Sequence, residues 1–118
     1  MSVKSKAEEL LAFHLRAAGL SAAREFRFHP TRKWRADFAF PAESLLIEVE
    51  GVTRYGKNKD GSMRLGRHQT AKGFTEDLVK YNAAALLGFR VLRFSPDMVK
   101  SGTALQDIER ALATGESA

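Results

Sequence analysis

Residues Trp34 to Gly51 read WRADFAFPAESLLIEVEG and show the clearest pattern of secondary structure in the chain. On both sides of Pro41, every second residue is hydrophobic, and a period of two residues is typical of β-strands. We therefore expect two strands, over residues 34–40 and 45–50, with a short connection at the proline. Strands joined by so few residues pair antiparallel.

Three carboxylates lie within these otherwise apolar strands: Asp37 on the first, and Glu48 and Glu50 on the second. Because Glu48 and Glu50 are two residues apart, both project from one face of their strand, roughly 6–7 Å apart. A buried carboxylate is costly unless something compensates its charge. Mg²⁺, which prefers oxygen ligands, is a common partner of converging carboxylates, and Mn²⁺ is its usual substitute. The alternative is a polar strand face whose acids pair with Lys33 or Arg35.

The remaining segments predict an α/β fold. Ser5 and Glu8 form a capping box, which predicts the start of a helix, and the inward stripe of that helix turns Glu8 toward the sheet. Similar patterns predict a helix over 5–19, a strand over 24–29, a helix over 74–87, a strand over 89–94 and a helix over 103–113. We expect one domain with a small mixed four-stranded sheet flanked by helices, in the order αβββαβα. The last strand should lie parallel to the third.

Length and composition limit the classes of protein to consider. A chain of 118 residues is expected to form one domain, with a core over about 5–113 and a frayed tail over 114–118. The absence of cysteine excludes disulfides, zinc–thiolate sites and a cysteine nucleophile. The charged N-terminus and the lack of a long apolar run predict a cytoplasmic protein of a bacterium or a phage-infected cell, without a membrane partner.

The segment 52–72 reads as a long loop, with no hydrophobic periodicity and three glycines. It holds six Lys or Arg residues against one acid, an excess equal to the net charge of +5 of the whole chain. Basic side chains neutralise phosphates, so the loop predicts DNA as a partner, or alternatively a loop kept basic for solubility. The candidate DNA-binding residues are Arg54, Lys57, Lys59, Arg64, Arg67, His68 and Lys72, together with Arg35 in the strand expected over residues 34–40.

A second basic cluster spans the first two expected strands and their connection, and comprises Arg24, Arg27, Arg32, Lys33 and Arg35. It would either follow the second strand of a duplex or pair with Glu25 and Glu43. The aromatic stripe of Trp34, Phe38 and Phe40 alternates with polar residues, and we expect it in the core rather than as a surface for stacking bases.

The ordered set of acids resembles the PD-(D/E)XK nucleases. Asp37 is followed by ten residues and then by Glu48-Val49-Glu50, after a helix with an inward Glu8. Downstream, Asp77 and Lys80 precede the run GFRVLRF at 88–94, which resembles the very-short-patch-repair endonucleases and small prophage-encoded proteins of that type. The resemblance implies Mg²⁺-dependent hydrolysis of phosphodiester bonds in DNA, with Asp37, Glu48 and Glu50 at the metal.

One residue departs from the motif, because Glu50 stands where these nucleases normally have the lysine that orients the attacking water. Lys80, on the following helix, is the candidate replacement, and Asp77 lies one turn before it. Glu8 would either lie in the outer shell of the metal or bind a second metal ion. The departure leaves open an inactive DNA-binding module of the same fold, or a subunit of a larger nucleic-acid-processing complex. Cutting both strands of a duplex would require a homodimer.

Overall fold

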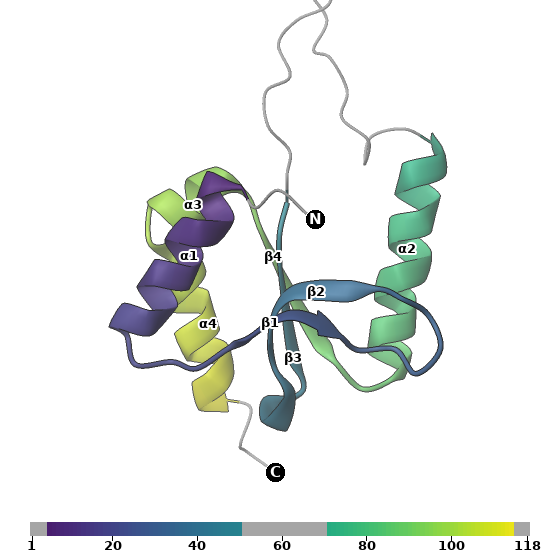
Figure 1. Cartoon of the computed structure of the whole chain (residues 1–118), viewed down its shortest axis with the longest axis horizontal. Helices are drawn as coiled ribbons and strands as arrows, with labels where there is room; N and C mark the ends of the chain where they lie inside the picture. Colours follow the sequence, from purple (N-terminus) through teal and green to yellow (C-terminus); the bar gives the residue numbers. More distant parts are fainter. Residues whose placement is uncertain (1–4, 51–70, 115–118) are drawn as a thin grey trace, which may run out of the picture.

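Four strands form one mixed sheet in the spatial order β1 (Ala23–Arg27), β2 (Arg35–Phe40), β3 (Leu45–Val49) and β4 (Arg90–Phe94). The first three form an antiparallel meander, and β4 pairs parallel to β3 with Leu92 beside Ile47. The computed structural model describes residues 5–50 and 71–114, and in these residues the expected single α/β domain and mixed sheet are confirmed (Figure 1).

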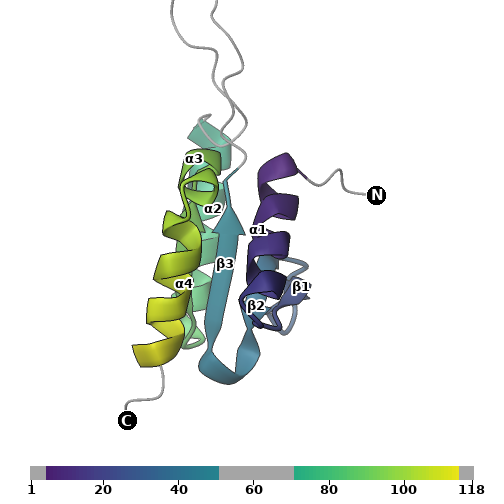
Figure 2. The same ribbon diagram turned by 90° about the vertical axis from the view of Figure 1, so that its left-hand side faces the viewer.

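Helices cover the sheet from both sides. The helices α1 (Lys6–Ala17), α3 (Pro96–Lys100) and α4 (Thr103–Thr114) pack together on one side, whereas α2 (Ala71–Leu86) covers the other (Figures 1 and 2). A short 3-10 turn, η1 (Pro41–Glu43), joins β2 to β3. Within the described ranges, no helix is both long and apolar enough to cross a membrane.

The core is divided by the sheet into two clusters. On the side of α1, α3 and α4, Phe38, Phe40 and Ile47 pack with residues such as Leu11 and Ile108. On the side of α2, a smaller cluster contains Phe28, Ala36, Ala39, Leu46 and Ala84. Phe38 and Ala39 of β2, and likewise Leu46 and Ile47 of β3, face opposite clusters, as alternation along a strand requires. This packing on both faces fixes β2 and β3, which carry Asp37 and Glu48.

The aromatic stripe is only partly core. Phe38 and Phe40 are buried as expected. Trp34 is half-buried, packs at the edge of the smaller cluster and lines a cavity.

Some expected boundaries were wrong. α2 begins at Ala71 rather than at Phe74, so Lys72 lies in a helix and not in the basic loop. Pro96 begins the helix α3 where only a turn was expected, because Ser95 Oγ accepts a hydrogen bond from Met98 N. Thr114, expected in the frayed tail, is the last residue of α4. The rest of that tail and the loop up to residue 70 lie outside the described residues.

Candidate active site

Asp37 is the carboxylate that ties the site to the backbone of the sheet. It lies on β2 and is half-buried, and its Oδ2 accepts a hydrogen bond of 2.8 Å from Val49 N at the end of β3. This contact holds one oxygen and leaves the other available to a ligand. Burial raises the pKa of Asp37 above its ordinary value, although the bond from Val49 acts in the opposite direction.

Glu8 and Glu25 bring two further carboxylates to Asp37. Each of the three offers one oxygen, and these oxygens lie within 4.8 Å of one another. Glu8 comes from the first turn of α1, where Ser5 Oγ accepts a hydrogen bond from Glu8 N. The cap uses the backbone of Glu8, so its side chain is left to face the sheet. The cap therefore does not prevent the Glu8 carboxylate from approaching Glu25 and Asp37.

Glu25 is the member of this group that the sequence did not indicate as a site residue. The pairing of Arg24 with Phe38 and of Phe26 with Ala36 places Glu25 opposite Asp37. Its φ of 51° lies in the left-handed region, which a residue other than glycine rarely adopts inside a strand. The available signal was an acid on the strand before Asp37, but the sequence did not give the register of the hairpin.

The charge of this three-carboxylate group is only partly balanced. Burial is the main cause that raises the pKa of Glu8, and the charges of Asp37 and Glu25 raise it further. Arg24 acts in the opposite direction, with its Nη2 at 3.5 Å from Glu8 and at 2.9 Å from Glu9. The guanidinium of Arg35 lies 3.8 Å from Glu25 and is exposed, so solvent screens it.

Glu48 lies beside this group and is paired with a cation from the opposite helix layer. Lys80 Nζ, from α2, donates to Glu48 Oε2 at 3.2 Å, and the side chain of Glu48 is only 12% exposed. Burial raises the pKa of Glu48 to about 7 in spite of Lys80. A carboxylate that titrates near neutral pH can take up and release a proton under ordinary conditions.

Glu50 makes a different ion pair. Arg93 Nε donates to Glu50 Oε2 at 2.9 Å, and the Arg93 guanidinium carbon lies 4.3 Å from the centre of the Tyr81 ring. Burial raises the pKa of Tyr81, so its hydroxyl stays protonated. Asp37, Glu48 and Glu50 were expected to converge on one metal. In the structure Glu48 pairs with Lys80 and Glu50 pairs with Arg93, whereas Asp37 lies with Glu8 and Glu25.

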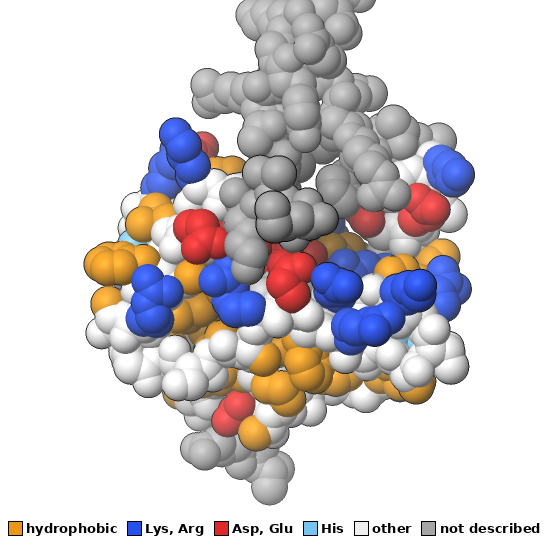
Figure 3. Space-filling view, viewed as in Figure 1, with side chains coloured by type: hydrophobic (Ala, Val, Ile, Leu, Met, Phe, Trp, Pro, Cys, Tyr) orange, Lys and Arg blue, Asp and Glu red, His pale blue; other side chains and the backbone are white. Residues whose placement is uncertain are grey.

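The expected DNA-binding residues are only partly described. Arg35 is exposed on β2 next to Glu25, and Lys72 is exposed on α2. Figure 3 shows basic side chains gathered over the β1–β2 hairpin, beside acidic side chains at the centre of this face. The other expected residues, which are Arg54, Lys57, Lys59, Arg64, Arg67 and His68, lie outside the described residues.

Comparisons with known proteins add one likeness of fold. No protein-family model matches the chain, and no curated protein matches it. Among solved structures, the chain is similar to the catalytic domain of the homing endonuclease I-Bth0305I, with a TM-score of 0.65 and 21% sequence identity. The likeness covers 97% of this chain and 100% of that domain. At this identity the likeness concerns the fold, so the chain has the fold of a homing-endonuclease catalytic domain.

Proposed function

We propose that this protein is a metal-dependent endonuclease that hydrolyses phosphodiester bonds in DNA. The observation that carries the proposal is the approach of Glu8, Glu25 and Asp37 to within 4.8 Å of one another, beside the Glu48–Lys80 pair. The fold shared with a homing-endonuclease catalytic domain supports the same reading. The basic surface over β1 and β2 supplies charges that attract phosphates.

The residues present fit a hard divalent cation. The donor set consists of carboxylate oxygens, which Mg²⁺ and Mn²⁺ prefer. The pKa of both Glu8 and Asp37 is raised by burial and by neighbouring carboxylates, so positive charge at this point would stabilise their ionised forms. We propose that Asp37, Glu8 and Glu25 hold the ion. When bound, such an ion polarises a phosphoryl oxygen and lowers the pKa of a coordinated water.

The chain's own residues would divide the remaining work. Val49 N holds Asp37 in place from the end of β3. Glu48, with its pKa of about 7, is placed to accept a proton from the attacking water. Lys80, the candidate replacement for the lysine that the motif lacks, holds Glu48 next to the attacking water and adds positive charge for the developing negative charge on phosphate. Glu50 is oriented by Arg93 at the edge of the site.

Cleavage of supercoiled plasmid DNA tests the proposal. Wild type with Mg²⁺ or Mn²⁺ should convert the plasmid to the nicked form, and to the linear form only if two copies act together. Asp37→Asn should lose at least a thousandfold in rate, since a ligand and its charge are removed. Glu109→Gln removes an exposed acid on α4 and serves as the matched control. Equal rates for wild type and Asp37→Asn would contradict the proposal.

A second candidate is a DNA-binding module that keeps the fold without catalysis. The observation that favours it is that Glu8, Glu48 and Glu50 each have a cationic partner, which are Arg24, Lys80 and Arg93. Such pairs can stabilise the acids without a metal. This candidate predicts salt-dependent DNA binding and no heat when Mn²⁺ is titrated into the protein, whereas a nuclease predicts binding heat that Asp37→Asn removes.

A further inference from the structure

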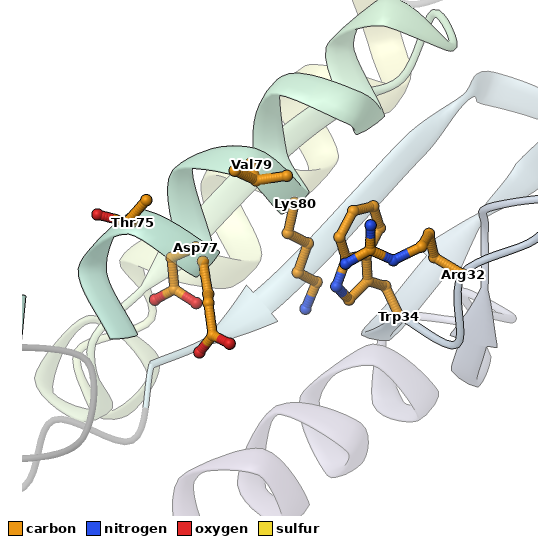
Figure 4. Close-up of a pocket in the computed structure, with 7 residues that line it drawn as sticks. Arg32, Trp34, Thr75, Asp77, Val79 and Lys80 are labelled. Atoms are coloured by element: carbon orange, nitrogen blue, oxygen red, sulfur yellow. The ribbon is translucent and has the colours of Figure 1, made fainter. Parts of the chain in front are cut away.

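A cavity of about 320 Å³ lies between α2 and the turn that leads into β2. Its lining residues are Arg32, Trp34, Thr75, Glu76, Asp77, Val79 and Lys80. Figure 4 shows Lys80 between the acidic side of the cavity and the side formed by Arg32 and Trp34. Because Lys80 also binds Glu48, the cavity adjoins the candidate active site without sharing its carboxylate group.

One wall of the cavity is a stack of Arg32 on Trp34. The guanidinium carbon of Arg32 lies 4.1 Å from the centre of the Trp34 ring. The ring is held from elsewhere by Phe28, nearly parallel at 18° and 6.3 Å away, and by the edge contact of His29 at 5.2 Å. The indole is therefore fixed, and the exposed arginine extends it as a flat cationic surface. Aromatic rings and guanidinium planes are the surfaces on which proteins stack unpaired bases.

The facing wall is mostly polar and belongs to the middle of α2. Thr75, Asp77 and Lys80 provide a hydroxyl, a carboxylate and an ammonium group, and Val79 adds an apolar contact (Figure 4). The edge of a nucleobase carries both hydrogen-bond donors and acceptors, which such a mixed wall can match. Glu76 and Asp77 place two carboxylates in the lining, which balance the charges of Arg32 and Lys80, so the lining has no net positive charge that would select a phosphate. The occupant should therefore be a neutral, flat and polar-edged group.

We propose that this cavity binds one unpaired base of a DNA substrate, stacked against Arg32 and Trp34. The inference rests on DNA being the substrate in the proposed function, but the lining of this cavity includes none of the three carboxylates proposed to hold the metal, which are Glu8, Glu25 and Asp37. An extruded base in this cavity would bring the adjacent backbone toward Lys80 and Glu48. The protein would then select DNA in which a base is already unpaired, since extruding a paired base costs unstacking energy.

Trp34 is the sole tryptophan of the chain, so its fluorescence reports directly on the cavity. The probes are three duplexes of one sequence: fully paired, with one single-base bulge, and with an abasic bulge that keeps the backbone but lacks the base. EDTA prevents hydrolysis during the measurement. We expect the base bulge to quench Trp34 emission and to bind about tenfold more tightly than the abasic bulge, the size typical of stacking one base.

Two substitutions separate stacking from general charge. Arg32→Ala removes half of the proposed stacking surface and should reduce the tenfold preference for the base over the abasic bulge to about twofold or less. Arg27→Ala removes an exposed arginine of β1 that does not line the cavity, and should weaken all three duplexes alike while keeping the preference. Equal affinity and equal quenching of wild type by the base and abasic bulges would overturn the inference. So would an unchanged preference in Arg32→Ala.

The outcome can be told apart from failure of the proposed function. Protein that cuts plasmid DNA with Mn²⁺ but binds base and abasic bulges equally is a nuclease without a base site. Protein that prefers the base bulge but cuts no DNA with any divalent metal retains the base site and loses the nuclease proposal.

Discussion

Lys80 Nζ lies 3.2 Å from Glu48 Oε2, and this pair joins α2 to β3 at the centre of the candidate active site. Both side chains are mostly buried, so their attraction is screened less than that of a surface pair. The contact gives a physical role to a lysine that lies thirty-two positions after its partner. It also makes the protonation of Glu48 depend on Lys80.

Lys80→Met should shift the acidic limb of the pH–rate profile to higher pH. Lys80 lowers the pKa of Glu48, which burial otherwise raises, so its loss should move that pKa above about 7. The rate at neutral pH should fall roughly ten- to a hundredfold and recover partly at alkaline pH. Lys100→Met, which removes an exposed lysine of α3, is the control. An unshifted profile in Lys80→Met would show that Lys80 does not set this titration.

Glu48 should make the metal-free protein less stable as the pH rises toward neutral. Its pKa is raised on folding from 4.5 to about 7, so the folded state binds the proton more tightly than the unfolded state. The associated stability is fully present below pH 4.5 and is lost as the pH rises through about 7. This loss should amount to about 3 kcal/mol. Asp37 and Glu8, whose pKa is also raised, act in the same direction.

Urea unfolding in EDTA at acidic and neutral pH measures this effect. Glu48→Gln cannot ionise and should remove most of the Glu48 share of the pH dependence, whereas Glu109→Gln should leave it unchanged. If the free energy of unfolding of wild type and Glu48→Gln varied identically with pH, the buried and neutral form of Glu48 would be excluded.

In most strand positions an alanine variant is more stable than a glycine variant, and at Glu25 we expect the opposite order. At its φ of 51°, a residue with a Cβ is strained by about 1 kcal/mol, so Glu25→Gly should be more stable than Glu25→Ala. At Arg27, on the same strand and without positive φ, the alanine variant should be the more stable one. Denaturant unfolding of the four variants checks this. Glu25→Ala more stable than Glu25→Gly would mean that the backbone strain is absent.

Much of the fold could be predicted from the sequence, because hydrophobic residues alternate along its strands. Alternating hydrophobic residues around Pro41 predicted β2 and β3, and the short connection predicted their antiparallel pairing. The expected parallel β4 is confirmed as well. The helix α3 was missed because it has five residues, too few for a periodic pattern, and its Ser95-Pro96 start reads equally well as a turn.

The site was harder to predict, because it depends on registers that are set by tertiary packing. Asp37, Glu8 and Lys80 were expected as site residues. Asp37 and Glu8 lie in the three-carboxylate group, and Lys80 pairs with Glu48 beside it. Glu25 joins them only through the register of the β1–β2 hairpin, and Arg93 reaches Glu50 only through the parallel pairing of β4 with β3. Trp34 was expected in the core because it alternates with polar residues. Alternation shows which face of a strand a side chain is on, but not whether other side chains cover it, and Trp34 lines a cavity at the edge of the smaller cluster.

The most direct test of the central claim is anomalous diffraction from a crystal soaked in Mn²⁺. We expect a peak in contact with carboxylate oxygens of Glu8, Glu25 and Asp37, which already lie within 4.8 Å of one another. The same soak of Asp37→Asn crystals should weaken or remove the peak. A peak held elsewhere in the protein, with none among these three carboxylates, would contradict the account.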